Sequence, residues 1–187
     1  SEIIFLDRDR VEVKFLNKMK ESSKPSNIEL AICLVKKNPM EIILQKATEL
    51  GVSRITPIIS ERTEVKELNY ERAQKIVIEA TEQSNQLNPP EVTKVIKLKD
   101  FLKKLDSGSK FLFADVNSQN NLQKKDVDGD ALKTILIGPE GDFSPGERES
   151  ILAKANTTSF SISKNILRSD TAVISAISLV NFINNLH

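Results

Sequence analysis

The stretch IELAICLV, from Ile28 to Val35, is an almost continuous run of apolar residues that follows a polar, proline-containing segment. A strand that covers a core on one face alternates apolar and polar residues, whereas a continuous apolar run is typical of a strand buried on both faces. Strands of that kind belong mostly to parallel sheets with helices on each side. The stretch therefore predicts an α/β domain that begins near residue 28.

Strand and helix patterns alternate over the rest of the chain. The segment from Pro39 to Leu50 has an apolar face at helical spacing, with proline in its first turn and Gly51 as a C-terminal stop. Such alternation predicts a mostly parallel sheet. Further patterns predict strands over residues 54–60, 110–116, 131–138 and 157–163, and helices over 69–84, 97–105, 145–156 and 169–186.

The first residues of the sequence have a different pattern. Two short strands are predicted on either side of a turn between Asp7 and Arg10, and a pair of strands alone is only marginally stable in water. The polar residues that follow them are typical of a linker. We therefore expect a small β unit over residues 1–21, a linker over 22–27 and the main domain over 28–187.

Composition argues against several classes of site and partner. The one cysteine, Cys33, lies inside the apolar run, and the one histidine, His187, is the last residue, so we expect neither a disulfide framework nor a metal site nor imidazole chemistry. The net charge of +1 means that a nucleic-acid partner needs a local basic patch. Because no apolar segment is long enough to cross a bilayer and no secretory signal is present, we expect a cytoplasmic protein without a membrane partner.

The segment IGPEGDFSPGE, residues 137–147, follows a predicted strand and contains three glycines and three acidic residues. Ligands of open α/β sheets bind at the carboxyl ends of strands. The glycine spacing is that of neither a dinucleotide fingerprint nor a phosphate loop, and the acidic residues would repel a pyrophosphate. The segment therefore favours a ligand with hydroxyls, an amino group or a cation. An ordinary turn before a capped helix is the alternative.

Arg168 precedes the last predicted helix, where a positive charge opposes the helix dipole. One interpretation is a local pair with Asp170. The other is that Arg168 contacts a ligand or a substrate oxygen. The sequence leaves both interpretations open.

Four segments, in this order, resemble the ribosomal RNA small subunit methyltransferase E family of the SPOUT superfamily. They are ILQKATELGVSRITPIISERTEV, EATEQSNQLNPPEV, ILIGPEGDFSPGE and ISKNILRSDTA. The resemblance implies S-adenosylmethionine-dependent methylation of uridine N3 in small-subunit (16S) ribosomal RNA. It also implies a homodimer whose α/β fold ends in a deep trefoil knot, preceded by a PUA-like β-barrel of which residues 1–21 are a remnant.

Two alternatives are kept beside this expectation. One is a non-catalytic RNA-binding module of the SPOUT fold, and the other is a SPOUT methyltransferase that acts on another RNA. The first gains weight from three departures from the family pattern: Asp142 and Ser163 stand in place of glycines, and Gln86 stands in place of arginine. Asp170, in place of glutamate, is a further departure.

The resemblance also implies roles for individual residues. Arg168 would stabilise negative charge on a uracil oxygen, with Glu140 or Asp170 accepting the proton or positioning the arginine. Arg62 and Lys46 match basic positions of the family and would contact RNA phosphate. The cofactor would be bound by Leu112, Phe113, Ala114, Gly138, Pro139, Glu140, Gly141, Ile162, Ser163, Ile166, Leu167 and Arg168.

Overall fold

The computed structural model describes residues 2–17 and 26–185. Near the N-terminus, β1 (Glu2–Leu6) and β2 (Val11–Lys14) pair as an antiparallel hairpin, as the sequence predicts. Its apolar side chains are exposed, among them Ile3, Leu6 and Phe15. The predicted boundary after residue 21 and most of the predicted linker lie outside the described residues.

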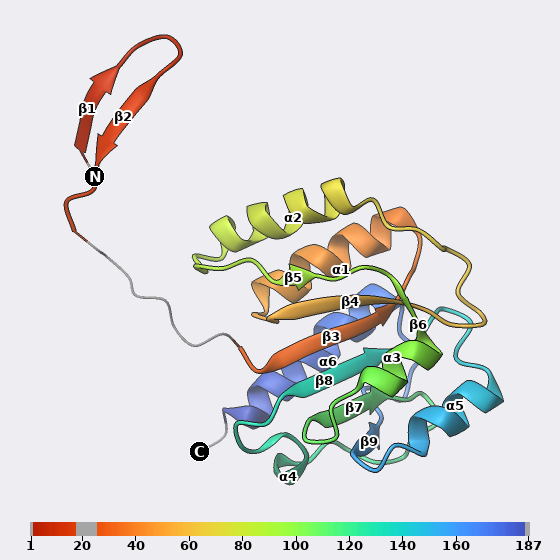
Figure 1. Ribbon diagram of the computed structural model, residues 1–187. Coiled ribbons are helices and arrows are strands. Elements are labelled where there is room, and N and C mark those ends of the chain that lie inside the picture. Colours follow the sequence, from red (N-terminus) through yellow and green to blue (C-terminus); the bar gives the residue numbers. More distant parts are fainter. Residues whose placement is uncertain (1, 18–25, 186–187) are drawn as a thin grey trace.

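The main body is built on a seven-stranded sheet in which every pair is parallel, which confirms the predicted α/β architecture with a parallel sheet (Figure 1). The spatial order is β5-β4-β3-β8-β7-β9, with β6 also beside β4. The strands are β3 (Ile28–Cys33), β4 (Arg54–Ile59), β5 (Glu91–Val92), β6 (Ile96–Lys97), β7 (Lys110–Ala114), β8 (Lys133–Ile137) and β9 (Thr157–Phe160).

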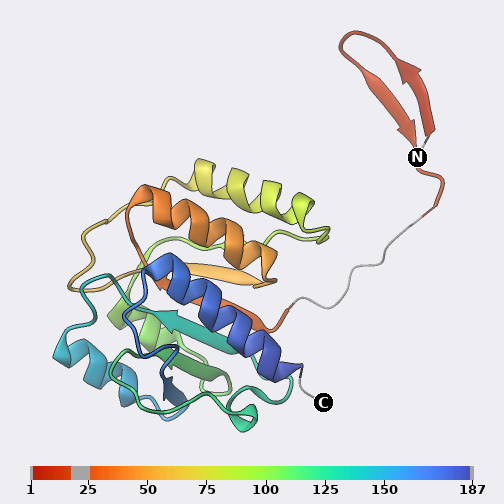
Figure 2. The same ribbon diagram turned by 180° about the vertical axis from the view of Figure 1, so that it is seen from behind.

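Helices cover both faces of the sheet (Figures 1 and 2). One face carries α1 (Lys37–Glu49), α2 (Tyr70–Gln83), α4 (Lys124–Val127) and α6 (Ser169–Asn184), and the other carries α3 (Leu98–Lys104) and α5 (Pro145–Leu152). Within β3, Leu30 and Ile32 point into the first core while Ala31 and Cys33 point into the second. The apolar run at 28–35 is therefore continuous because each side of β3 has its own core.

Several element bounds differ from the expected ones. The helix expected over 145–156 ends at Leu152, and the strand expected over 157–163 ends at Phe160. Two elements have little signal in the sequence. The helix α4 has four residues and one buried side chain, Val127, and β5 and β6 have two residues each, which is too short for any periodicity to be visible.

The carboxyl ends of three neighbouring strands coincide. Ala114, the last residue of β7, lies opposite both Ile137 of β8 and Phe160 of β9. The segments that leave these strands therefore start side by side at one edge of the sheet. They are residues 115–123, 138–144 and 161–168.

Gln86, where the family pattern has arginine, holds the end of α1. Its side-chain amide donates to the backbone carbonyl of Thr48 at 2.6 Å and to that of Glu49 at 3.3 Å. The last carbonyl groups of a helix lack partners within the helix, so these bonds stabilise the α1 terminus. The departure at Gln86 thus has a structural role of its own.

We expect Gln86→Ala to lower the free energy of unfolding by about 1–2 kcal/mol, because it removes hydrogen bonds to part-buried carbonyl groups. Urea denaturation measures the change. The control is Gln83→Ala, an exposed glutamine of α2, for which a change within about 0.5 kcal/mol is expected. Equal stabilities of the two variants would contradict the capping role.

Candidate functional site

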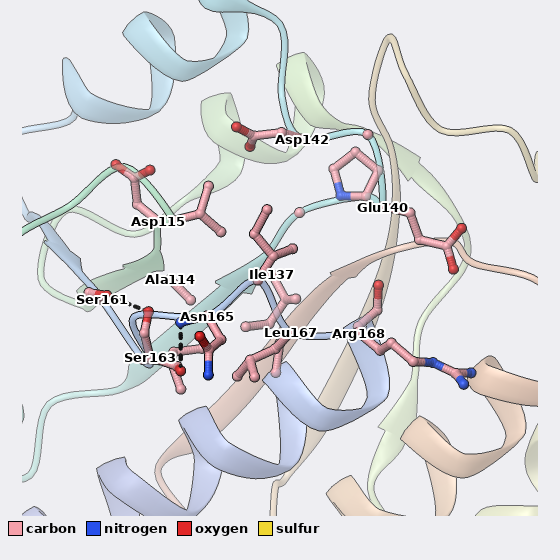
Figure 3. A pocket seen from close by; sticks show the side chains of 18 residues that line it. Ala114, Asp115, Ile137, Glu140, Asp142, Ser161, Ser163, Asn165, Leu167 and Arg168 are labelled. Carbon is pink, nitrogen blue, oxygen red and sulfur yellow. Dashed lines mark hydrogen bonds between the residues drawn. The ribbon is translucent and has the colours of Figure 1, made fainter.

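The three segments at the carboxyl ends of β7, β8 and β9 enclose a cavity of about 640 Å³ (Figure 3). That volume is typical of small-molecule sites. Segments far apart in the sequence thus meet at the place where ligands of parallel sheets bind. Ten of the predicted cofactor-binding residues line the cavity: Ala114, Gly138, Pro139, Glu140, Gly141, Ile162, Ser163, Ile166, Leu167 and Arg168.

The other two predicted cofactor-binding residues, Leu112 and Phe113, lie within β7 behind the cavity wall. Leu112 is buried in the core beneath α1 and α6. Phe113 is buried in the opposite core, where its ring packs edge-on against Phe143 with the centroids 5.6 Å apart. Both support the wall from behind without lining the cavity.

The lining combines apolar side chains with carboxylates. Ile137, Ile162 and Leu167 provide apolar surface, whereas Glu140 and Asp142 add acidic groups. Ile166 stands out because 90% of its surface is exposed, which is unusual for a large apolar side chain beside a cavity. A ligand in the cavity would cover it.

Asp115 is the most strongly held polar group of the lining, and its side chain is fully buried. It accepts hydrogen bonds from Arg148 of α5 at 2.6 Å, from the Asn117 N–H at 2.9 Å and from the Ser159 hydroxyl at 3.1 Å. Burial acts to raise the pKa of the Asp115 carboxyl, but the hydrogen bonds outweigh it and hold the pKa below its ordinary value. Asp115 is therefore a carboxylate that ties β7 to β9 and α5.

The sequence analysis missed Asp115, although a signal was present. The residue directly follows the apolar strand of residues 110–114, and polar residues at that position face the ligand edge of a parallel sheet. Its partner Arg148 lies 33 positions further on, so the pair itself cannot be found from local spacing.

Asp142 replaces the second glycine of the family pattern, and its backbone has a φ of 58°. That left-handed conformation favours glycine, and aspartate is one of the residues that tolerate it best. The Asp142 carboxylate also accepts the Phe143 N–H at 2.7 Å and the Asn117 amide at 3.3 Å. The loop thus keeps the backbone shape that glycine would give.

Gly138 is required by close packing. A Cβ atom at this position would lie 3.0 Å from the Phe143 ring, closer than side chains normally approach. Because Phe143 in turn packs on Phe113, a larger residue would displace a buried aromatic pair as well as the cavity wall.

The loop after β4 holds the outer side of the glycine-rich segment. Arg62, a predicted RNA-binding residue, donates to the Gly141 carbonyl at 3.0 Å. The adjacent Glu61 N–H donates to the Glu147 carboxylate at 2.9 Å, and Glu147 also forms the predicted capping box with Ser144. Arg62 therefore lies at the cavity rim.

Ser163, at another glycine position of the family pattern, lies within a tight turn (Figure 3). Its carbonyl accepts the Ser161 hydroxyl at 3.1 Å, and its own hydroxyl accepts the Asn165 N–H at 3.0 Å. The serine closes the turn through its side chain, so this departure does not open the wall.

Arg168 and Glu140 lie at the same rim of the cavity (Figure 3). Arg168 forms the local pair that the sequence suggested, with its guanidinium 3.6 Å from the Asp170 carboxylate. The arginine side chain is 74% exposed and that of Asp170 only 14% exposed. Asp170 is adjacent to the lining, and its partner extends into solvent from the rim.

Lys46 is not brought to this site. It pairs with Glu49 near the C-terminal end of α1, at 2.8 Å. Since α1 leaves the carboxyl end of β3 and returns to the amino end of β4, Lys46 lies toward the opposite edge of the sheet. Its predicted RNA contact stays a prediction.

Residues 2–17 and 26–185 contain no candidate for a membrane-spanning helix or for a metal site. No helix there has the length and apolarity to span a bilayer. No group of three or more histidine, cysteine or acidic side chains there is placed to hold a metal ion.

The chain is similar to known proteins over most of its length. A family model described as an RNA methyltransferase domain matches residues 20–181. A ribosomal RNA small subunit methyltransferase E of Rickettsia conorii is 32% identical over 96% of this chain and 74% of its own length.

Solved structures are similar over most of the chain. A probable rRNA-methyltransferase from Porphyromonas gingivalis is 28% identical with a TM-score of 0.87, covering 97% of this chain and 78% of that one. A ribosomal RNA small subunit methyltransferase E from Neisseria gonorrhoeae, bound to S-adenosyl methionine, is 31% identical with a TM-score of 0.80. The match covers 90% of this chain and 70% of that one.

We expect Asp115→Asn to be less stable than the wild type by about 1–3 kcal/mol at pH 7, since it weakens several hydrogen bonds to a buried group. A carboxyl whose pKa is lowered by folding stabilises the folded state at pH values above its unfolded pKa, which is about 3.9. This stabilisation is lost as the pH falls through the lower pKa of the folded state. The difference should therefore narrow below about pH 4.

Urea denaturation between pH 3 and pH 7 measures this difference. Glu149→Gln, an exposed position of the same helix as Arg148, is the control and should show little change. If the difference in unfolding free energy between the wild type and Asp115→Asn stayed constant from about pH 3 to pH 7, the ionised pair of Asp115 with Arg148 would be refuted.

Proposed function

The chain belongs to the ribosomal RNA small subunit methyltransferase E family, and from that membership we propose that it methylates uridine N3 in small-subunit (16S) ribosomal RNA, with S-adenosylmethionine as the methyl donor. The observation that supports this most is the cavity at the ends of β7, β8 and β9. Two of its three walls come from segments that carry the family resemblance, ILIGPEGDFSPGE and ISKNILRSDTA. A cytoplasmic location, where ribosomes are assembled, is part of the proposal.

The cavity lining fits the proposed cofactor. S-adenosylmethionine combines an apolar base with ribose hydroxyls, an amino acid group and a positive sulfonium, and contains no phosphate. Ile137, Ile162 and Leu167 offer apolar surface for the base, while the backbone around Gly138 can approach closely. The carboxylates of Glu140 and Asp142 favour positive groups over phosphate. When bound, the cofactor supplies an electrophilic methyl group.

The rim residues have side chains suited to activating a uracil. The N3 atom of neutral uracil carries a proton and is a poor nucleophile, so the enzyme must accept that proton and stabilise the resulting charge. Arg168 always carries a positive charge and extends from the rim, where it can face a uracil oxygen. Glu140, at the same rim, would accept the proton, and Asp170, which pairs with Arg168, would orient the arginine.

The alternative of a non-catalytic module loses much of its support. It rested on departures from the family pattern, and three of them have local structural roles. Asp142 keeps a glycine-like backbone, Ser163 closes a turn and Gln86 caps α1. The cavity remains formed despite all three. The remaining alternative is action on another RNA, which identification of the methylated RNA distinguishes.

We also propose the finer features of the fold that the resemblance implies. The Ser161 N–H donates to the Asn120 carbonyl at 2.8 Å, so the chain leaving β9 runs against the β7–β8 connection before it enters α6. This contact is compatible with threading of α6 through that connection, as in a trefoil knot. An experimental backbone trace that passes outside the connection would contradict the knot.

A homodimer and an N-terminal RNA-binding unit complete the proposal. Phe182 of α6 is 64% exposed and Ile42 of α1 is 40% exposed, on two helices that pack together, which gives a second copy an apolar surface to cover. Residues 1–21 would belong to a PUA-like β-barrel and residues 22–27 to a linker. The exposed apolar side chains of the β1–β2 hairpin suit such a larger β unit.

For cofactor binding, we expect Ile166→Ala to weaken binding of S-adenosylhomocysteine by about 10-fold. A bound ligand would bury most of the Ile166 side chain, and full burial of such a side chain contributes about 2 kcal/mol. Isothermal titration calorimetry measures the affinity. Thermal stability should not change, since the side chain is 90% exposed. Ile78→Ala, an exposed isoleucine of α2, is the control and should bind like the wild type. Unchanged affinity in Ile166→Ala would remove this side chain from the site.

For catalysis, we expect the wild type to form 3-methyluridine in small-subunit ribosomal RNA and Arg168→Ala to lower turnover by about 100-fold, as for loss of a group that stabilises developing charge. Mass spectrometry of digested RNA identifies the nucleoside and its amount. Lys164→Ala, an exposed cation of the same loop, should retain full turnover. A different methylated nucleoside, or methylation of another RNA instead, would refute the proposed specificity.

A further inference from the structure

A second cavity lies outside the cofactor site, on the face of the sheet that carries α3 and α5 (Figure 1). It measures about 590 Å³ and runs between these two helices. Four lysines line it, namely Lys97, Lys99, Lys103 and Lys154, and we call it the lysine groove. In a chain whose net charge is only +1, four cations around one groove are a local concentration of positive charge.

Two of the four lysines are not explained by helix stability. Lys103, in the last turn of α3, and Lys154, just after α5, complement the negative ends of their helices. Lys97 is the N-cap residue of α3 and Lys99 lies in its first turn, where a positive charge opposes the dipole.

The acidic residues of the groove offset only part of its charge. Glu61 and Glu147 line the groove beside the four lysines, which leaves an excess of two positive charges. The Glu147 carboxylate accepts the backbone N–H groups of Glu61 at 2.9 Å and Ser144 at 3.1 Å, which hold it beside the loop after β4. The pair between Lys103 and Asp100 is long, at 3.6 Å, and exposed on both sides, so it leaves the lysine available to a ligand.

The lysine groove and the rim of the cofactor cavity lie on either side of the loop after β4. Glu61 and Glu147 line the groove, and the neighbouring Arg62 donates to the carbonyl of Gly141, which lines the cofactor cavity. The loop after β4 therefore separates the two sites by a few residues. A chain molecule lying in the groove has its next units near the cavity rim.

We propose that the lysine groove binds the phosphates of the RNA strand that flanks the methylated nucleotide. The inference rests on the proposed function, which supplies RNA as the substrate. Lysines bind phosphate as point charges without reading sequence. The groove would therefore hold and orient the strand, while the residues at the cavity rim select the reacting base.

The test compares two triple variants that remove the same charge. Lys97→Gln, Lys99→Gln and Lys154→Gln together remove three of the four positive charges of the groove, and the control removes those of Lys75, Lys124 and Lys125 on helices of the other face. Binding of transcribed small-subunit ribosomal RNA is measured over a range of KCl concentrations. The logarithm of the binding constant falls linearly with the logarithm of the salt concentration, by about 0.7–0.9 per phosphate contact. The magnitude of this slope should be smaller by about 2–3 in the groove variant and should stay near the wild-type value in the control.

The outcomes separate this inference from the proposed function. The proposed role of the groove would be overturned if the groove variant kept the wild-type slope. It would also be overturned if the slope fell equally in both triple variants. Failure of the wild type to bind S-adenosylhomocysteine would overturn the proposed function and leave the salt comparison interpretable. If the triple variant does not fold, the single variants Lys99→Gln and Lys154→Gln each test the proposal. In each of them the magnitude of the salt-dependence slope should fall by about 0.7–0.9.

Discussion

The parallel pairing of β7, β8 and β9 is the constraint on which the rest of the site depends. Because Ala114 lies opposite Ile137 and Phe160, the three strands end in register, and the chain must leave all three at one edge. The backbone hydrogen bonds of the sheet thus bring residues 114–116, 137–142 and 161–169 around one cavity. Asp115 strengthens this arrangement, since its carboxylate joins the end of β7 to Ser159 of β9 and Arg148 of α5.

Residues that depart from the family pattern keep the shape of the cavity by different means. Glycine reaches a left-handed backbone at no steric cost, while Asp142 does so with its carboxylate hydrogen-bonded to the next N–H group. Ser163 replaces backbone freedom with a side-chain hydrogen bond across its turn. Gly138, by contrast, has no room for a side chain beside Phe143. Gly138 is thus required for space, whereas an aspartate keeps the left-handed backbone at residue 142.

The two cavities on either side of the loop after β4 differ in charge. The cofactor cavity contains carboxylates beside apolar walls, whereas the lysine groove contains four cations. Their separation favours different ligand chemistries within a short distance, a positively charged cofactor on one side and a polyanionic chain on the other. Arg62 lies between them and is held on the Gly141 carbonyl, so the rim is linked to the loop that borders the groove.

The sequence by itself determined the features that depend on neighbouring residues. The apolar run at 28–35 indicated a sheet buried on both faces, and the capping box at Ser144 marked the start of α5. The pair of Arg168 with Asp170 was one of the two interpretations that the sequence left open. The tertiary structure alone decided which distant residues meet. Asp115 and Arg148 are 33 positions apart, and the groove lysines come from two separate helical segments. Periodicity and capping act within a few residues, whereas such pairs form only when strand pairing and helix packing bring distant segments together.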